Sequence, residues 1–336
     1  MTTDLKINTA AGHRPKKQGE KPELQAAIPY ERMTAAAAIR LAAVHTWAAS
    51  VCPALLGIFW CLHRGLPLSP AQCILLAGAC VLSQSAVNTL NDYVDFVSGA
   101  DSEEDHVEVN DAVLIYYRVN PKHALILGFV YLASAAICGI AAAWNSGPVP
   151  FIIGIIGGLT VLGYSIGPLP VASLPLGELV SGFVMGGLIP LGTAAVADGR
   201  FHLEILPYSL PLILGIALIM LSNNGSDIEK DIRAERTTLP VVLGRPRALV
   251  LYRMMLAAWI ALLCICPAVS TGWIGLVSFL LTALLGRKPF GFLIRAKLLP
   301  EDRIRQMKSI TAANMIGNGM LSAAFAASWL LRLMGS

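Results

Sequence analysis

Long apolar runs alternate with short polar segments along most of the chain. A helix that spans a membrane needs about 20 mostly apolar residues, and the runs of this length predict nine spanning helices. Their approximate ranges are 41–62, 68–90, 123–144, 149–166, 174–197, 206–224, 249–266, 270–286 and 310–332. We expect residues 1–40 to form a polar cytosolic tail and residues 41–336 to form one transmembrane domain. The predicted fold class is all-α, a polytopic membrane bundle.

The composition excludes a water-soluble globule. Hydrophobic residues make up 55% of the 336 residues and charged residues only 14%, with a mean hydropathy of +0.64, whereas soluble domains are about 25% charged. The basic residues behind the net charge of +4 are scattered between apolar runs, so we expect no nucleic-acid partner. The seven cysteines all lie inside apolar runs and their number is odd, which does not indicate a disulfide framework.

The distribution of positive charge sets the predicted topology, because Lys and Arg concentrate in the cytosolic loops of membrane proteins. The stretch 249–286 can be read as one span or two, since only Pro267 and Thr271-Gly272 interrupt it. Two spans place 22 Lys and Arg on the cytosolic side and three outside, whereas one span gives 16 and nine. We therefore expect nine spans in a multi-pass protein of the cell inner (plasma) membrane, with a cytosolic amino terminus.

Two pairs of glycines have the small-residue spacing that lets membrane helices approach closely. They are Gly154-x-x-x-Gly158 and Gly182-x-x-x-Gly186. We interpret both as helix-packing positions that need no ligand.

The polar segments 91–119 and 225–247 both fall on the cytosolic side, because an even number of predicted spans separates them. If the second predicted helix continues into the first segment, it carries Asn88, Asp92 and Asp95. Their spacing of four and three places these side chains on one helical face. An isolated Asp-x-x-Asp also fits a solvated helix end.

The second polar segment repeats this arrangement after the sixth predicted span. Asn224, Asp227 and Asp231 share a face there. Polar and ionisable groups at a helix end inside a membrane bundle are costly and usually line a site or a polar path. Because two matching clusters lie on the same side, we interpret them as one shared site that opens to the cytosol.

Four carboxylates that share a site repel one another unless a cation lies between them. Mg²⁺ is commonly bound by one or two carboxylates together with substrate phosphates, so two facing clusters predict two or more Mg²⁺ that bridge a diphosphate. Lys230, Arg233 and Arg236 follow the second cluster closely. Their positive charges suit the remaining phosphate oxygens, and Arg binds such oxygens bidentately.

At these residues the chain resembles the UbiA superfamily of intramembrane prenyltransferases. Asn91-Asp92-Tyr93-Val94-Asp95 matches the first motif of that superfamily, Asn-Asp-x-x-Asp. The longer runs at 91–101 and 223–231 are similar to the 1,4-dihydroxy-2-naphthoate prenyltransferase branch, which makes menaquinone precursors. Similar runs recur in order at Pro53-Ala-Leu-Leu-Gly57, at Tyr164-Ser-Ile-Gly-Pro168 and at Leu176-Gly-Glu178.

The resemblance implies a nine-helix UbiA-type bundle with cytosolic Asp-rich loops. It also implies Mg²⁺-dependent transfer of a polyprenyl group from polyprenyl diphosphate to an aromatic acceptor, within a lipid bilayer. For 1,4-dihydroxy-2-naphthoate, the branch implies loss of CO₂ and a proton to give a demethylmenaquinone-type product.

Each candidate side chain then has an expected role. We expect Asp92, Asp95, Asp227 and Asp231 to be catalytic metal ligands, with Asp101 as a further metal ligand. We expect Asn88, Asn91, Arg118, Lys230, Arg233 and Arg236 to bind the diphosphate. We expect Asn224, Tyr164, His45 and Glu178 to bind the acceptor. For most acids of the loop 101–111 we favour a solvated face.

Two alternatives stay open at this point. The acceptor can be another that the superfamily uses: 4-hydroxybenzoate, homogentisate, a porphyrin or a glycerol phosphate. An ion-coupled transporter also uses buried carboxylates, but its polar groups usually lie near the bilayer midplane on broken helices, whereas these clusters lie at cytosolic helix ends.

Overall fold

The computed structural model describes residues 30–99 and 113–335, which form helices apart from short connections and one isolated β-bridge between Glu31 and Val119. Most of the expected amino-terminal tail and the acidic segment 101–111, including Asp101, lie outside the described residues. The all-helical class expected from the sequence is confirmed for the part of the chain that is described.

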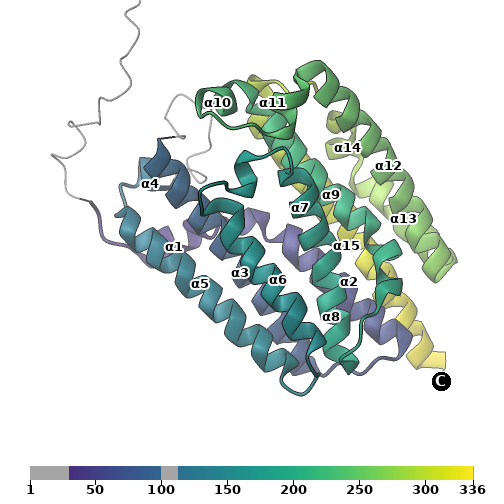
Figure 1. Cartoon of the computed structure of the whole chain (residues 1–336). Helices are drawn as coiled ribbons and strands as arrows, with labels where there is room; N and C mark the ends of the chain where they lie inside the picture. Colours follow the sequence, from purple (N-terminus) through teal and green to yellow (C-terminus); the bar gives the residue numbers. More distant parts are fainter. Residues whose placement is uncertain (1–29, 100–112, 336) are drawn as a thin grey trace, which may run out of the picture.

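The helices form a bundle with α10 and α11 at one end and the carboxyl terminus at the other (Figure 1). Their bounds are α1 Ala35–Leu41, α2 Ala48–Arg64, α3 Pro70–Ser98, α4 Val113–Tyr116, α5 Pro121–Ala143, α6 Val149–Ser165, α7 Gly177–Phe183, α8 Ile189–Asp198, α9 Leu206–Ser226, α10 Ile228–Arg233, α11 Leu239–Leu243, α12 Arg245–Thr271, α13 Trp273–Leu285, α14 Arg287–Leu293 and α15 Arg303–Gly335. A 3₁₀ turn, Val44–Thr46, precedes α2, and a π-helical turn, Val184–Leu188, joins α7 to α8.

The predicted count of nine spanning helices is not confirmed. Helix occupies each of the nine predicted ranges. Among the described residues, however, only five helical segments are long and apolar enough to cross a membrane. The number is seven if each of two bent pairs counts as one span: Ala35–Thr46 with Ala48–Arg64, bent by 62°, and Trp273–Leu285 with Arg287–Leu293, bent by 72°. The remaining predicted spans correspond to α6, which has 17 residues, and to α15.

The division of the stretch 249–286 into two helices follows from its glycines. α12 continues through Pro267 and ends at Thr271, and Gly272 then adopts φ 61° and ψ −128°. This backbone conformation strongly favours glycine. Gly275 follows so closely that a Cβ there would lie 2.0 Å from the Pro267 carbonyl oxygen. The break expected near Pro267 and Gly272 is therefore present, at Gly272.

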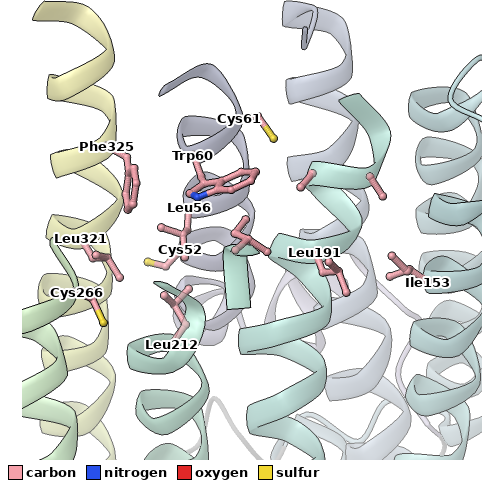
Figure 2. Close-up of a cluster of buried hydrophobic side chains, with 13 residues drawn as sticks. Cys52, Leu56, Trp60, Cys61, Ile153, Leu191, Leu212, Cys266, Leu321 and Phe325 are labelled. Carbon is pink, nitrogen blue, oxygen red and sulfur yellow. The ribbon is translucent and has the colours of Figure 1, made fainter. Parts of the chain in front are cut away.

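The largest buried cluster surrounds α2. Leu56 and Trp60 of α2 meet Leu212 of α9 and Phe325 of α15, and all four side chains are at most 1% exposed (Figure 2). Among helices in a membrane, such packing stabilises the bundle by van der Waals contact, because lipid tails are as apolar as the side chains. This packing places α2 between α15 and the α8–α9 pair.

The two glycine pairs that were predicted to pack against another helix differ in the structure. Gly182 and Gly186 face α9, and a Cβ on Gly186 would lie 2.4 Å from the backbone nitrogen of Ile213. The predicted close helix contact is therefore confirmed there. The same interpretation is wrong for Gly154 and Gly158, because a Cβ built on either residue would have no described atom within 4 Å apart from the adjoining part of its own helix.

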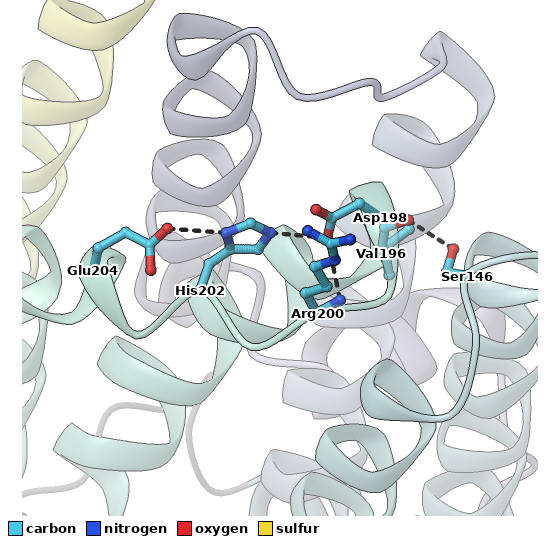
Figure 3. Close-up of polar contacts among 6 residues, drawn as sticks. All are labelled: Ser146, Val196, Asp198, Arg200, His202 and Glu204. Carbon is cyan, nitrogen blue, oxygen red and sulfur yellow. Dashed lines mark hydrogen bonds and ion pairs between the residues drawn. The ribbon is translucent and has the colours of Figure 1, made fainter.

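The connection between α8 and α9 holds a polar cluster at the end of α9 opposite to α10. His202 bonds through Nε2 to Asp198, at 2.8 Å, and through Nδ1 to Glu204, at 3.1 Å (Figure 3). Burial opposes charging of the imidazole, but the two hydrogen bonds and the carboxylate charges outweigh it, so the pKa of His202 is raised above 6.5. Ser146 donates to the carbonyl of Val196, at 2.6 Å, which ties the α5–α6 connection to α8.

Candidate active site

One cavity of about 1370 Å³ brings both polar clusters together. The polar end of the cavity lies beside the carboxyl-terminal part of α3 and beside the junction between α9 and α10. The lining includes most of the residues expected from the sequence: His45, Asn88, Asn91, Asp92, Asp95, Tyr164, Asn224, Asp227, Lys230, Asp231 and Arg236. The two Asp pairs, which are more than 130 positions apart in the chain, therefore line a single cavity.

Contacts with two other parts of the chain hold Asn91 and Asp95 in place. Asn91 donates to Asp95 at 3.0 Å and accepts from Ser165 at the end of α6 at 3.2 Å. Arg236, from the connection between α10 and α11, forms an ion pair with Asp95. This contact joins the first cluster directly to the segment that carries the second.

Asn88 connects α3 to the turn before α2. Its Nδ2 atom donates to the Ala42 carbonyl at 3.0 Å and to the Thr46 hydroxyl at 2.8 Å. Asn88 lines the cavity, but these bonds also give it a structural role that its spacing from Asp92 did not indicate.

The second cluster forms where α9 changes into α10. Asp227 lies at the break, with φ −105° and ψ 14°, and its carboxylate accepts from Arg303 Nε at 2.7 Å. Arg303 Nη2 also donates to Asn223 at 2.9 Å. Asp231, one turn further on, accepts from the Thr238 hydroxyl at 2.8 Å.

Asp231 is 4% exposed, and this burial raises the pKa of its carboxyl to about 6. The hydrogen bond from Thr238 opposes the rise, and the negative charge of Asp227 adds to it. A nearby cation favours the ionised form of such a carboxyl. Additional positive charge near Asp231 would therefore stabilise its ionised carboxylate.

Two of the four expected acceptor-side residues, Asn224 and Glu178, are bonded to each other. Asn224 Nδ2 donates to Glu178 Oε1 at 2.9 Å, and the Glu178 side chain is 3% exposed. Asn224 lines the cavity, whereas Glu178 lies behind it and is not among the lining residues. Tyr164 lines the same cavity, and its hydroxyl contacts the sulfur of Met220 at 3.7 Å.

Some expected residues lie elsewhere, and others were not expected. Arg118 and Arg233 do not line the cavity, and Asp101 lies outside the described residues. Arg303 and Lys308 do line it. They were missed because the charges of their segment were used only to predict the topology. The last span was expected to start at residue 310, after both residues. Since α15 begins at Arg303, its first turns reach the second cluster.

The other part of the cavity is apolar and follows the length of α3. Its lining includes small or aliphatic residues of α3, α5 and α6: Leu76, Ala79, Cys80, Ala135, Ala136, Gly139, Gly154, Gly157 and Gly158. From Asp92 to Leu76 the cavity follows 16 residues of helix, about 24 Å at 1.5 Å per residue. The open space beside Gly154 and Gly158 is therefore part of this apolar extension.

The four carboxylates fit a metal that binds together with its substrate. Within residues 30–99 and 113–335, no three His, Cys, Asp or Glu side chains are grouped closely enough to hold a metal ion by themselves. Mg²⁺ prefers oxygen ligands and often takes only one or two carboxylates, completing its shell with water and substrate phosphates. Two carboxylate pairs line one cavity, and a cation near Asp231 would stabilise its buried carboxylate. This arrangement suits Mg²⁺ bound by one or two carboxylates and by substrate phosphates.

Comparison with known proteins agrees with this geometry. Residues 50–310 match the model of the UbiA prenyltransferase family. The chain is 30% identical over 281 residues to 1,4-dihydroxy-2-naphthoate octaprenyltransferase of Bacillus subtilis, covering 83% of this chain and 88% of that protein. It is 26% identical over 250 residues to human UbiA prenyltransferase domain-containing protein 1, covering 73% and 72%.

Solved structures share the fold. A UbiA homologue from Aeropyrum pernix K1 superposes with a TM-score of 0.60 at 20% identity, covering 84% of this chain and 98% of that one. A UbiA homologue from Archaeoglobus fulgidus bound to GPP and Mg²⁺ superposes with a TM-score of 0.57 at 16% identity, covering 85% and 99%. The resemblance seen in the motifs thus extends over most of the chain, and the protein belongs to the UbiA prenyltransferase family as a multi-pass membrane enzyme.

Proposed function

We propose that this enzyme transfers a polyprenyl group from polyprenyl diphosphate to 1,4-dihydroxy-2-naphthoate, in the biosynthesis of menaquinone. The observation that carries the proposal is the single cavity, which joins two carboxylate pairs to an apolar extension of about 24 Å. A polyprenyl diphosphate has two matching parts, a charged diphosphate and a long hydrocarbon tail. The relative from Bacillus subtilis, a naphthoate octaprenyltransferase, supports the choice of acceptor.

Asp92, Asp95, Asp227 and Asp231 would hold two or more Mg²⁺ with the donor diphosphate. When bound, Mg²⁺ acts as a Lewis acid that withdraws charge from the departing diphosphate. Lys230, which lines the same part of the cavity, binds the phosphate oxygens as a point charge.

Arg236 and Arg303 would contribute further positive charge to the leaving diphosphate. Both line the cavity, and each is held in place by a carboxylate, Asp95 and Asp227 respectively. Preorganised charges of this kind stabilise a developing anion without reorganising during the reaction.

The apolar walls and Tyr164 would protect the allylic carbocation that forms when the C–O bond breaks. An aromatic face stabilises a nearby cation electrostatically, and the apolar lining excludes water that would otherwise capture it. The electron-rich ring then forms the C–C bond. Its carboxyl group leaves as CO₂ with loss of a proton from the acid form, which gives a prenylated naphthalenediol.

Asn224 and His45 would bind the acceptor, since both line the cavity and Asn224 lies one turn before Asp227. Glu178 would act through Asn224 as a positioning residue. Its carboxylate accepts from Asn224 Nδ2, which fixes the orientation of the Asn224 amide.

The test is prenyl transfer by the purified protein in detergent, with Mg²⁺ and a polyprenyl diphosphate. Three acceptors are compared by product mass: 1,4-dihydroxy-2-naphthoate, 4-hydroxybenzoate and homogentisate. We expect a decarboxylated, prenylated naphthalenediol that is lost in Asp92→Ala and in Asp227→Ala. Glu229→Gln is the matched control, because this nearby acid pairs with Arg245 at 2.7 Å and does not line the cavity.

Two results would change the proposal. Transfer only to another ring would keep the two-cluster mechanism and replace the acceptor. Absence of Mg²⁺-dependent turnover with every donor and acceptor, in protein shown to be folded, would contradict the proposed reaction and favour an ion-coupled transporter.

A further inference from the structure

A second cavity, of about 520 Å³, lies between α14 and the first turns of α15. Pro289 and Phe292 of α14 form apolar parts of its wall, and Ile304 and Ala312 of α15 form others. Ile304, Lys308 and Ala312 also line the substrate cavity. This face of α15 therefore separates the two cavities, and the second one serves no part of the reaction proposed above.

α14, which forms one wall of the second cavity, turns away from α13 by 72°. The turn is at Gly286, where a Cβ would lie 2.7 Å from the Thr282 carbonyl oxygen and 2.6 Å from the Phe290 ring. The cavity lies at the end of the bundle that holds the carboxylate pairs, since the neighbouring Arg303 contacts Asp227.

Positive charge concentrates around this cavity. The segment 287–308 holds seven Lys and Arg against two acids. Three of these cations, Lys288, Arg305 and Lys308, line the cavity, and all three are exposed. One acid, Glu301, also lines it, but the charge of Glu301 interacts with Arg245 of α12.

The position of Arg305 is fixed by stacking. Its guanidinium lies 4.4 Å from the centroid of the Phe292 ring, an arrangement that is electrostatically favourable. Stacking reduces the side-chain entropy that Arg305 would lose on binding a ligand. The cavity therefore presents a preorganised guanidinium beside two flexible ammonium groups and an apolar wall.

We propose that this cavity binds the phosphate headgroup of an anionic phospholipid of the surrounding bilayer. Basic pockets between membrane helices bind anionic headgroups in this way. Lys288 and Arg305 supply charge-assisted hydrogen bonds to the phosphate. The apolar wall formed by Phe292 and Ile304 accommodates the start of an acyl chain. The bound lipid lies outside the substrate cavity, on the opposite side of the first turns of α15.

Native mass spectrometry of the delipidated full-length protein tests the proposal. The protein in detergent is titrated with phosphatidylglycerol and, separately, with phosphatidylcholine, which has no net charge. We expect phosphatidylglycerol to bind tightly and phosphatidylcholine weakly. In the double variant Lys288→Ala/Arg305→Ala, phosphatidylglycerol should bind about 30-fold more weakly. Lys308 is left unchanged because it also lines the substrate cavity.

Two further variants separate the site from general surface charge. Arg247→Ala/Arg253→Ala removes two exposed cations of the neighbouring α12 that do not line the cavity, and it should bind phosphatidylglycerol like the unchanged protein. Lys288→Arg/Arg305→Lys keeps both charges and should retain most of the affinity. Thermal unfolding of each variant confirms that it is folded.

The source of the phosphate is tested by competition with inorganic phosphate and inorganic diphosphate. We expect neither to displace phosphatidylglycerol at millimolar concentration, because they have no acyl chain for the apolar wall. Displacement by either ion would assign the cavity to a soluble phosphate and overturn the lipid proposal. Equal binding of the two lipids, or unchanged binding in Lys288→Ala/Arg305→Ala, would also overturn it. Because the readout is lipid binding, the result is independent of the acceptor and of turnover.

Discussion

One carboxylate in each cluster is paired with an arginine from a distant part of the chain. Asp95 of α3 is bound by Arg236, and Asp227 is bound by Arg303 of α15. The pairs fix the two guanidinium groups within the cavity, where a diphosphate would meet them.

The Arg303 pair leads to a first prediction. Arg303→Gln should lower kcat/KM for polyprenyl diphosphate about 10- to 100-fold, because it removes a charged donor at a partly buried site. The KM for the aromatic acceptor should change little. Steady-state kinetics with each substrate varied in turn measure both effects, and Arg253→Gln, an exposed cation of α12, is the control. An equal loss in the two variants would contradict the role of Arg303.

A second prediction concerns the buried Glu178. Glu178→Ala removes the acceptor of the Asn224 hydrogen bond and should raise the KM for the aromatic acceptor about tenfold, the effect of about 1.4 kcal/mol. The KM for the donor should stay the same. Glu178→Gln keeps a carbonyl oxygen that can accept from Asn224 and should recover part of the loss. A change confined to kcat would argue for direct participation of Glu178 in the reaction.

At this scale the sequence predicted the residues better than their contacts. Motif spacing placed the four Asp residues and Asn224 among the candidates, because the members of each cluster recur at helical spacing, although α9 ends before Asp227. It could not identify Arg303, which is 76 positions from Asp227 and lies in a segment with no motif. It also could not show that Asn88 is bonded to the turn before α2, since that contact depends on tertiary packing.

At the scale of elements, the positions of the helices could be predicted and their ends less so. Apolar length identified every long helix within residues 30–99 and 113–335, because a helix that spans lipid needs it. The start of α15 at Arg303 was missed because polar residues fill its first turns. The bend between α13 and α14 was missed as well, since apolar length alone does not report where a helix changes direction.

The connection between α8 and α9 leads to a third prediction. The pKa of His202 is raised above 6.5 by Asp198 and Glu204, so the protonated imidazole stabilises the folded state. This contribution is complete below pH 6.5 and is lost as the pH rises through the folded-state pKa.

The prediction is checked by thermal unfolding in detergent. His202→Gln should lower the midpoint at pH 6 and have a smaller effect at pH 9. The exposed His123 of α5 supplies the control variant His123→Gln, which should show no such difference. An effect of His202→Gln that is the same at both pH values would show that packing against Trp60, at 5.8 Å between ring centroids, rather than charge is responsible.

At the scale of the whole molecule, the bundle brings two distant carboxylate pairs to one cavity. The sequence predicted this from topology, because an even number of spans separates the clusters. It could not predict the apolar extension along α3, since Gly154 and Gly158 were interpreted as packing positions. Whether small residues contact another helix or leave open space depends on the arrangement of all the neighbours.

A fourth prediction follows because α3 and the junction between α9 and α10 line the same cavity. A non-hydrolysable polyprenyl diphosphate analogue with Mg²⁺ should stabilise the folded protein, by about 2.7 kcal/mol at a concentration 100 times its Kd. Thermal unfolding should show the increase, and EDTA should abolish it. Asp92→Asn and Asp227→Asn should each remove most of it. If one variant kept the full increase, that carboxylate would not belong to the binding site.

The contact of Gly186 with the backbone of Ile213 has a consequence for movement within the bundle. Because no side chain separates the two backbones, the middle of α9 is fixed against the π-helical turn. Asn223, Asn224 and Asp227, at the end of α9, therefore lie on a helix that has little freedom to move. Any widening that admits a substrate must therefore come from the opposite wall, formed by α3 and α5, or from α15. For engineering, larger acceptors are better sought by varying those walls than by altering α9.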